Sequence, residues 1–254
     1  MDLLGQFTDR YSRTARLVPA VLVVLPLCVL AVTAVPVLVT VWGKVAAVVA
    51  AAGLPFVFAQ VVRDRGGRAQ DRLFEAWGGP PTVALLRWRT GEEPAVFRRH
   101  QLLRSRTGVT LPTAAAEESD PARADALYRI AAAALRERTR DTARFPRVFD
   151  ENIAYGFRRN TYACRTPALV VCGLTAVLTV LAARLSLVSL GWRQQLALVG
   201  FDALAALGWL FWCTEDTVRR AADTYARQLF VALEVLADGP PAEEAKPVDD
   251  PAGG

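Results

Sequence analysis

Charged side chains are almost absent from two long stretches of the chain and crowded into the segment between them. Residues 17–62 contain one charge, Lys44, and residues 167–213 contain only Arg184, Arg193 and Asp202. A helix that crosses the hydrocarbon core of a bilayer needs about 20 mainly apolar residues. Each stretch is long enough for two such helices, and the apolar runs are residues 17–41, 45–62, 167–183 and 195–213.

The connection inside each stretch has the composition of a membrane surface. Trp42-Gly43-Lys44 divides the first stretch, and Gly191-Trp192-Arg193 ends the connection in the second. Tryptophan beside a cation is typical of the headgroup level. Prolines inside the runs are tolerated in transmembrane helices, because neighbouring helices can satisfy the freed carbonyls. The pattern therefore predicts two transmembrane hairpins.

Arginines flank every predicted span on one side of the membrane. The positive-inside rule places such clusters in the cytoplasm, so both termini and the segment between the hairpins are predicted to be cytoplasmic, in a bacterial inner membrane. The short tips carry one or two cations each. The flanking clusters are Arg10, Arg13 and Arg16; Arg63, Arg65, Arg68 and Arg72; Arg158, Arg159 and Arg165; and Arg219, Arg220 and Arg227.

The segment between the hairpins, residues 63–166 and hereafter the insert, is predicted to be helical, since no alternating strand pattern occurs in it. Asp120 and Pro121 form the clearest helix start, as N-cap and first helical residue. The helix that follows has an apolar stripe of Leu127, Ile130, Ala131, Ala134 and Leu135. The expected helices are 68–77, 82–89, 94–105, 121–144 and 146–162.

An amphipathic helix is expected after the last span, continuing from it. Its apolar residues share one face and are Val218, Ala222, Tyr225, Leu229, Ala232 and Leu236. This face could form a seam between subunits of a homo-oligomer or pack against the insert of the same chain. The residues from 239 onward read as a disordered acidic tail.

These patterns predict an all-α protein with four transmembrane helices in two hairpins and a cytosolic helical domain inserted between spans 2 and 3. The expected parts are a cytosolic N-terminal segment (1–16), hairpin 1 (17–62), the insert (63–166), hairpin 2 (167–213), an amphipathic helix (214–238) and the tail (239–254).

The net charge of +5 does not indicate nucleic acid as a partner. The chain has 28 arginines and 2 lysines, a ratio that points to codon bias in a GC-rich genome. Anionic headgroups attract such arginines by about 1 kcal/mol each, which makes the lipid bilayer the expected partner. The four cysteines form no CxxC and lie in or beside apolar segments, so buried thiols are expected, with no metal and no cofactor.

Residues Trp77, Gly78, Gly79 and Thr82 form the first candidate site, in the string WGGPPT before a predicted helix. Glycines allow close backbone approach, and amides at a helix N-terminus attract anions, so a phosphate-containing ligand could bind there with Arg87 and Arg89 nearby. Neither GxxxxGK[ST] nor GxGxxG accompanies it. A tight turn with Trp77 as a hydrophobic plug is the competing interpretation.

The densest polar and aromatic cluster, ENIAYGFRRN, lies a few residues before the third span. In a helix, Asn152, Tyr155 and Arg159 share a face. The cluster is either a coupling element or ligand contact, or a helix at the membrane surface with arginines at the headgroups. The candidate residues are Asn152, Tyr155, Arg158, Arg159 and Asn160.

Asp202 lies about eight residues into the fourth span. A carboxylate there costs on the order of 3 kcal/mol and usually faces a partner or an aqueous path. Arg184 is a candidate partner, and Thr175 and Thr179 could offer hydroxyls. The residue supports either an ion-conducting role or a structural contact between helices.

Catalytic motifs are missing from the sequence. It contains no nucleophile elbow, no HExxH and no diagnostic pair of carboxylates. The single histidine, His100, stands near Arg98, Arg99 and Arg104, which favours a neutral imidazole on a solvated face. We therefore expect a protein that is not an enzyme.

Three strings, LFEAWGGPPTVALLR (73–87), DPARADALYRIAAAALRERTRD (120–141) and FPRVFDENIAYGFRRN (145–160), resemble a group of bacterial multi-pass membrane proteins without an assigned activity. The resemblance spans the insert and its flanking spans. It implies that the insert and the hairpins form one unit, and it assigns no functional residue.

The function that fits these features is a membrane protein whose cytosolic domain senses a ligand or a protein partner and couples it to the transmembrane bundle. A membrane-perturbing effector, such as those of bacterial defence systems, has this architecture. The alternatives are a small channel or transporter that uses Asp202, and a scaffold that recruits a cytosolic partner.

Overall fold

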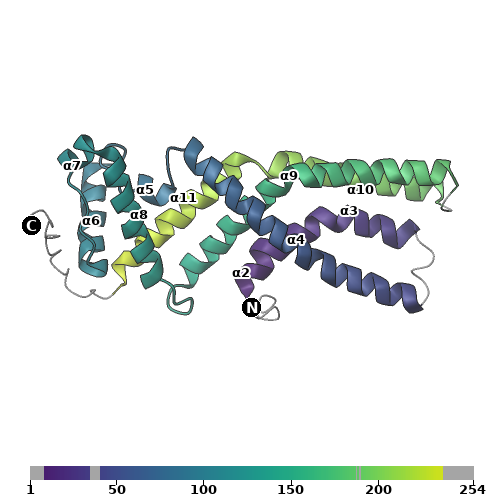
Figure 1. Ribbon diagram of the computed structural model, residues 1–254, viewed down its shortest axis with the longest axis horizontal. Coiled ribbons are helices and arrows are strands. Elements are labelled where there is room, and N and C mark those ends of the chain that lie inside the picture. Colours follow the sequence, from purple (N-terminus) through teal and green to yellow (C-terminus); the bar gives the residue numbers. More distant parts are fainter. Residues whose placement is uncertain (1–8, 35–40, 187, 189, 237–254) are drawn as a thin grey trace, which may run out of the picture. The chain divides into compact units, whose positions relative to one another are not determined.

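The computed structural model describes residues 9–34, 41–186, 188 and 190–236, and for residues 34 and 41–58 the backbone alone (Figure 1). The described residues are helical and contain no strand, as the sequence predicts. The expected N-terminal segment up to residue 8 and the expected tail from 239 onward lie outside them. The main helices are α3 (Val18–Ala34), α4 (Val41–Ala76), α6 (Glu93–Thr107), α8 (Pro121–Arg138), α9 (Pro146–Arg184), α10 (Trp192–Trp212) and α11 (Glu215–Val231).

Three helical segments are long and apolar enough to cross a membrane, which indicates membrane association. They are Arg10–Thr33, Pro146–Arg184 and Trp192–Trp212. The remaining predicted span, residues 45–62, lies in α4, and most of its side chains fall outside the described part. The fourth span and the direction of all spans therefore stay predictions.

The chain divides into two compact units. The first comprises Met1–Gly78 and Glu151–Ala222, and the second comprises Gly79–Asp150 and Asp223–Gly254. In the first unit, side chains from α3, α4, α9 and α10 meet in one apolar core. Its buried members are Ala20, Val23, Val62, Cys164, Ala168, Cys172 and Trp209. All four cysteines are free thiols.

The turn of the first hairpin does not lie where the sequence pattern puts it. Residues 42–44 are already helical, because α4 begins at Val41, and α3 ends at Ala34. The end of α3 precedes Pro36 by two residues, and a residue before proline is disfavoured in helical conformation. The proline outweighs the Trp-Gly-Lys string as a helix terminator. In the second connection Gly191 is the N-cap of α10, and Trp192 and Arg193, which were expected in the connection, are the first residues of the helix.

Helix α9 is one helix of 39 residues where two were expected. It continues through Pro167, a residue that a transmembrane helix can hold inside its length. Residues 146–150 of α9 belong to the second unit, and residues 151–184 belong to the first unit. Val148 packs in the core of the second unit, and Ala168 packs in the core of the first.

The second unit is a cluster of short helices around one apolar core. α5 (Pro81–Ala84), α6, α7 (Ala114–Ser119) and α8 contribute to this unit, together with the C-terminal part of α11 and a 3-10 turn, Ala232–Glu234. Its largest fully buried side chains are Leu86, Leu103, Tyr128, Leu135, Leu229 and Leu233.

Helix α8 begins as predicted and ends earlier. Asp120 accepts a hydrogen bond from the Arg123 amide, which confirms it as the N-cap. The helix ends at Arg138 and not at residue 144, because the Thr139 hydroxyl bonds to the Leu135 carbonyl and its backbone leaves the helical region. The predicted stripe is correct for Ala131 and Leu135 and wrong for Ile130, which is 57% exposed.

Two further helices differ from the pattern. The helix expected over 82–89 is only α5, because the amides of Trp88 and Arg89 bond to the Glu117 carboxylate instead of to helical carbonyls. Helix α11 does not continue from α10, since Cys213 leaves the helical region with ψ 71°. Its predicted face is buried except for the half-buried Tyr225, and from Tyr225 onward this face packs into the core of the second unit, as in the second of the two alternatives.

Candidate functional site

A buried amide on α9 is the centre of a polar network in the first unit. Asn160 is fully buried; its Nδ2 donates to the Ala15 carbonyl oxygen at 2.5 Å, and its Oδ1 accepts from Arg159 Nε at 3.2 Å. Ala15 lies in a π-helical turn, Arg13–Leu17. Such turns are rare overall. Where they occur they are often at functional sites, because they change the normal pairing of backbone carbonyls. Here the Asn160 side chain satisfies one of those carbonyls.

The network extends from α9 to α4 through one glutamine. Gln70 Oε1 accepts from Tyr155 Oη at 3.0 Å and from Arg159 Nη1 at 2.6 Å. The Arg159 guanidinium also lies 5.6 Å from the centre of the Tyr155 ring, within range of a cation–π contact. Within the described residues Arg159 forms no ion pair, so neutral groups hold its charge.

Two glycines allow the helices to approach at this point. A Cβ added at Gly66 would collide with the Asn160 side-chain oxygen, and one added at Gly156 would lie 2.8 Å from Tyr11 Oη. Small residues at such crossings let backbones come close, as is usual between membrane helices. We call Ala15, Gln70, Tyr155, Arg159 and Asn160 the α9 network.

The structure brings together three of the five residues predicted in this cluster. Tyr155, Arg159 and Asn160 belong to the α9 network. Asn152 is half-buried and stands outside it. Arg158 lines a different, mainly apolar pocket of about 660 Å³ between α3, α9 and α10. Gln70 and Ala15 were not found by sequence reasoning, because a polar residue in an arginine-rich helix and an alanine in an apolar run carry no signal of their own.

The residues of the WGGPPT string do not form one site. Trp77 Nε1 donates to Glu215 at 2.8 Å, and Arg219 lies over its ring, all within the first unit. Gly78 and Gly79 have φ of 72° and 127°, which explains the glycines as a turn. Thr82 is buried in the second unit.

The arginines expected to hold a phosphate near this string are paired with carboxylates. Arg87 makes two bonds to Asp125, at 2.8 and 2.6 Å, and Arg89 bonds to Glu117 at 2.9 Å. Helix α5 has only four residues and offers no N-terminal anion site. The turn is therefore the interpretation that the geometry favours.

Glu117 is the polar centre of the second unit. Its carboxylate accepts from Tyr128 Oη at 2.6 Å and from the Trp88 amide at 2.8 Å. Burial alone would raise the pKa of Glu117, but these hydrogen bonds and Arg89 outweigh burial and hold the pKa below its ordinary value. Burial and the bond to Glu117 raise the pKa of Tyr128.

His100 is buried, which corrects the solvated face expected for it. Its Nε2 lies 2.8 Å from the Leu86 carbonyl oxygen, and its ring packs edge-on against Trp88. Burial lowers the pKa of His100, so the imidazole is neutral and donates from Nε2. Val96 and Leu103, on the same face of α6, are buried with it. The arginines beside His100 in the sequence had indicated a solvated face, so the buried face of α6 was not predicted.

Asp202 is buried in α10, with 4% of its surface exposed, and its carboxylate is near Thr175 of α9, whose hydroxyl donates to the Val171 and Cys172 carbonyl oxygens of its own helix. Arg184, the other partner considered, is exposed and makes no ion pair with it in the described part of the chain. A hydroxyl contact between two apolar helices favours a structural role and leaves an ion path open as the alternative.

No family model, curated protein or solved structure matches this chain. The site is therefore interpreted from its own geometry. In the α9 network, neutral hydrogen-bonding groups hold the Arg159 guanidinium between α4 and α9. The network contains no nucleophile paired with a base.

Proposed function

We propose that the protein is a membrane protein in which the second unit senses a ligand or partner and the α9 network passes the signal to the apolar helices. The observation that supports this most is the continuity of α9. One helix contributes Val148 to the core of the second unit, the residues of the network, and Ala168 to the core of the first.

The energies involved suit a switch. The bonds that Arg159 makes to Gln70 and Asn160 involve a charged donor, and such bonds contribute about 1.5–3 kcal/mol each. Coupling between two sites in proteins is typically about 1–3 kcal/mol. Breaking and remaking one of these bonds is therefore enough to bias the membrane helices between two arrangements.

The response that we propose is a change in membrane permeability by an oligomer of the chain in a bacterial inner membrane. Large apolar side chains of α10 are exposed in the single chain, among them Leu204 and Phe211, and these can face lipid or a second copy. Rearrangement of such helices would open a path for ions, as in membrane-perturbing effectors.

Depolarisation of bacterial cells tests this function. Tyr128→Phe removes the hydrogen bond to Glu117 in the second unit and stands in for the unidentified signal. We expect cells that produce Tyr128→Phe to lose membrane potential, measured with a potential-sensitive dye, and the double variant with Arg159→Gln to keep it. Arg140→Gln, an exposed change in the second unit, is the matched control for Arg159→Gln.

The outcome that contradicts the proposal is depolarisation that persists in the double variant while both proteins are inserted in equal amounts. A second candidate function is supported by the buried carboxylate of Asp202 beside Thr175. A channel or transporter that uses this acid would lose ion flux on Asp202→Asn and would be insensitive to Arg159→Gln.

A further inference from the structure

Three arginines line a pocket beside the α9 network. Arg65, Arg68 and Arg72 border a pocket of about 520 Å³ together with Asp71 and with Ala163 of α9. At about 100° per residue, the three arginines fall within roughly 60° of one another around α4. Gln70 of the network lies on the same two turns of this helix.

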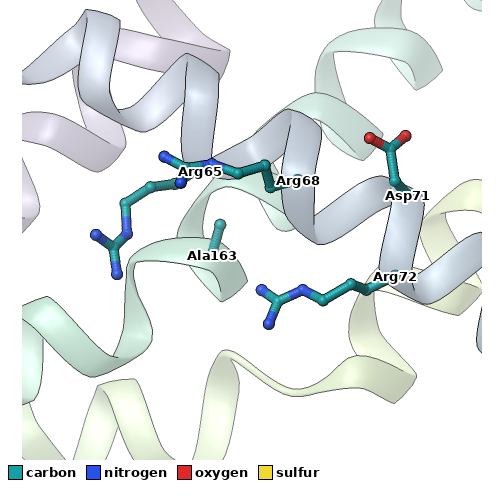
Figure 2. Close-up of a pocket in the computed structure, with 5 residues that line it drawn as sticks. All are labelled: Arg65, Arg68, Asp71, Arg72 and Ala163. Carbon is teal, nitrogen blue, oxygen red and sulfur yellow. The ribbon is translucent and has the colours of Figure 1, made fainter.

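The three arginine side chains extend toward the same side of α4 in Figure 2, and the carboxylate of the one acid points elsewhere. Figure 2 shows Arg65 and Arg72 extended on either side of Ala163, with Arg72 directed back along α4 and the Asp71 carboxylate pointing away from it. Within the described residues none of the three arginines forms an ion pair; Arg68 Nε makes one long bond, 3.4 Å, to the Asp64 carbonyl. Three like charges that form no ion pair among the described residues favour a nearby anion.

The end of the pocket at Arg65 and Ala163 lies at the depth of lipid headgroups if α4 and α9 cross the membrane. Arg65 is three residues past the buried Val62, or about 4.5 Å along the helix, and Arg72 is about 15 Å past it. Ala163 precedes Pro167, where the apolar run of α9 begins, by about 6 Å. The headgroup region is about 5–8 Å thick on each side, and long arginine side chains reach into it.

We propose that this pocket binds a phosphate group, either of an anionic phospholipid or of a soluble phosphate compound. Guanidinium groups bind phosphate through paired, charge-assisted hydrogen bonds, and several of them can share its oxygens. A pocket of this volume is in the usual range for small ligands. All residues that line this pocket belong to the first unit and not to the proposed sensor, so its binding is measured separately from the proposed function.

Binding is tested with the purified full chain in detergent by two probes. Native mass spectrometry measures retention of phosphatidylglycerol relative to phosphatidylcholine, and calorimetry measures binding of inorganic pyrophosphate. We expect the triple variant Arg65→Gln, Arg68→Gln and Arg72→Gln to bind the preferred probe roughly a hundredfold more weakly, from about 1 kcal/mol per arginine. The control of equal charge removes Arg129, Arg136 and Arg147, which are exposed in the second unit.

Each outcome decides the proposal. Selective retention of phosphatidylglycerol assigns the site to a lipid, and binding of pyrophosphate assigns it to a soluble compound. Binding of neither probe, or equal losses in the triple variant and its control, overturns the site. A triple variant with lysine at the same three positions keeps the charge and controls for a folding defect in the glutamine variant. It should bind the preferred probe more weakly than wild type, because lysine lacks the paired hydrogen bonds of arginine. Normal binding together with depolarisation by Tyr128→Phe that persists in the Arg159→Gln background would refute the proposed function alone.

Discussion

Adding a single methyl group at Gly66 tests whether the buried amide of Asn160 holds the membrane helices together. The ideal Cβ at Gly66 collides with the Asn160 side-chain oxygen and lies 3.4 Å from Arg159 Nε. The next residue, Gly67, is in the same helix, and a Cβ added there meets nothing within 4 Å. Gly66→Ala and Gly67→Ala therefore change the same helix by the same atom and differ only in what that atom meets.

The magnitudes follow from the contacts. Both variants gain about 1 kcal/mol because alanine is a better helix former than glycine. In Gly66→Ala the Asn160 side chain must move, which leaves the Ala15 carbonyl without its bond at a cost of about 1–3 kcal/mol. Overpacking adds about 1–3 kcal/mol. We expect Gly66→Ala to lower the free energy of unfolding by roughly 1–5 kcal/mol and Gly67→Ala to raise it slightly.

The assay is unfolding of the full chain in mixed micelles by titration with a denaturing detergent, followed by far-ultraviolet circular dichroism. The reasoning is refuted if the two variants differ by less than about 0.5 kcal/mol, the usual scatter of changes that touch nothing important. It is also refuted if Gly67→Ala is the more destabilised variant.

Three other changes probe separate features. Gly156→Ala should destabilise the chain in the same assay, since its Cβ meets Tyr11 Oη at 2.8 Å, whereas Gly173→Ala on the same helix meets nothing and should not. Tyr128→Phe should destabilise the second unit by about 1.5–3 kcal/mol at neutral pH. The pKa of Glu117 is lowered in the folded state, so its contribution is present above the ordinary glutamate pKa of about 4.3 and is lost as the pH falls below it. Acid unfolding followed by tryptophan fluorescence should accordingly be shallower in Tyr128→Phe, and an identical slope would contradict this assignment. Asp202→Asn should keep the Thr175 contact and leave both stability and membrane potential near wild type, and loss of ion flux would instead support a channel.

The apolar helices could be predicted from the sequence because their signal is local. Long apolar runs with few charges specify α3, α10 and the second half of α9 whatever surrounds them, and Asp120 with Pro121 specifies the start of α8 in the same local way. Helix α3 ends shortly before Pro36 and not at Trp42-Gly43-Lys44, although proline is a local signal as well. The prediction gave Trp42-Gly43-Lys44 more weight than the stronger constraint that Pro36 places on the backbone.

The remaining errors come from contacts between distant residues. Glu117 takes the amides of Trp88 and Arg89 and the hydroxyl of Tyr128, which ends one predicted helix and turns Tyr128 inward. Tyr128 consequently lies in the core in place of Ile130. Such a partner, about 29 positions away, leaves no periodic trace in the sequence.

The candidate site was found in part for the same reason. Tyr155, Arg159 and Asn160 stood out as a polar cluster before an apolar run. Their partners, Gln70 and the Ala15 carbonyl, lie 85 and 145 positions away from Tyr155 and Asn160. A backbone carbonyl exposed by a π-turn has no side-chain signature, so only the three-dimensional structure identifies it.

Hydrogen exchange of the amides of residues 157–166, measured in lipid nanodiscs, tests the proposed coupling most directly. Tyr128→Phe perturbs the second unit alone, and the α9 network is predicted to carry that change into this stretch of α9 as faster exchange. In the background of Arg159→Gln the same Tyr128→Phe change should have no effect there. Exchange that does not respond to Tyr128→Phe, or that responds equally in both backgrounds, would contradict coupling through the α9 network.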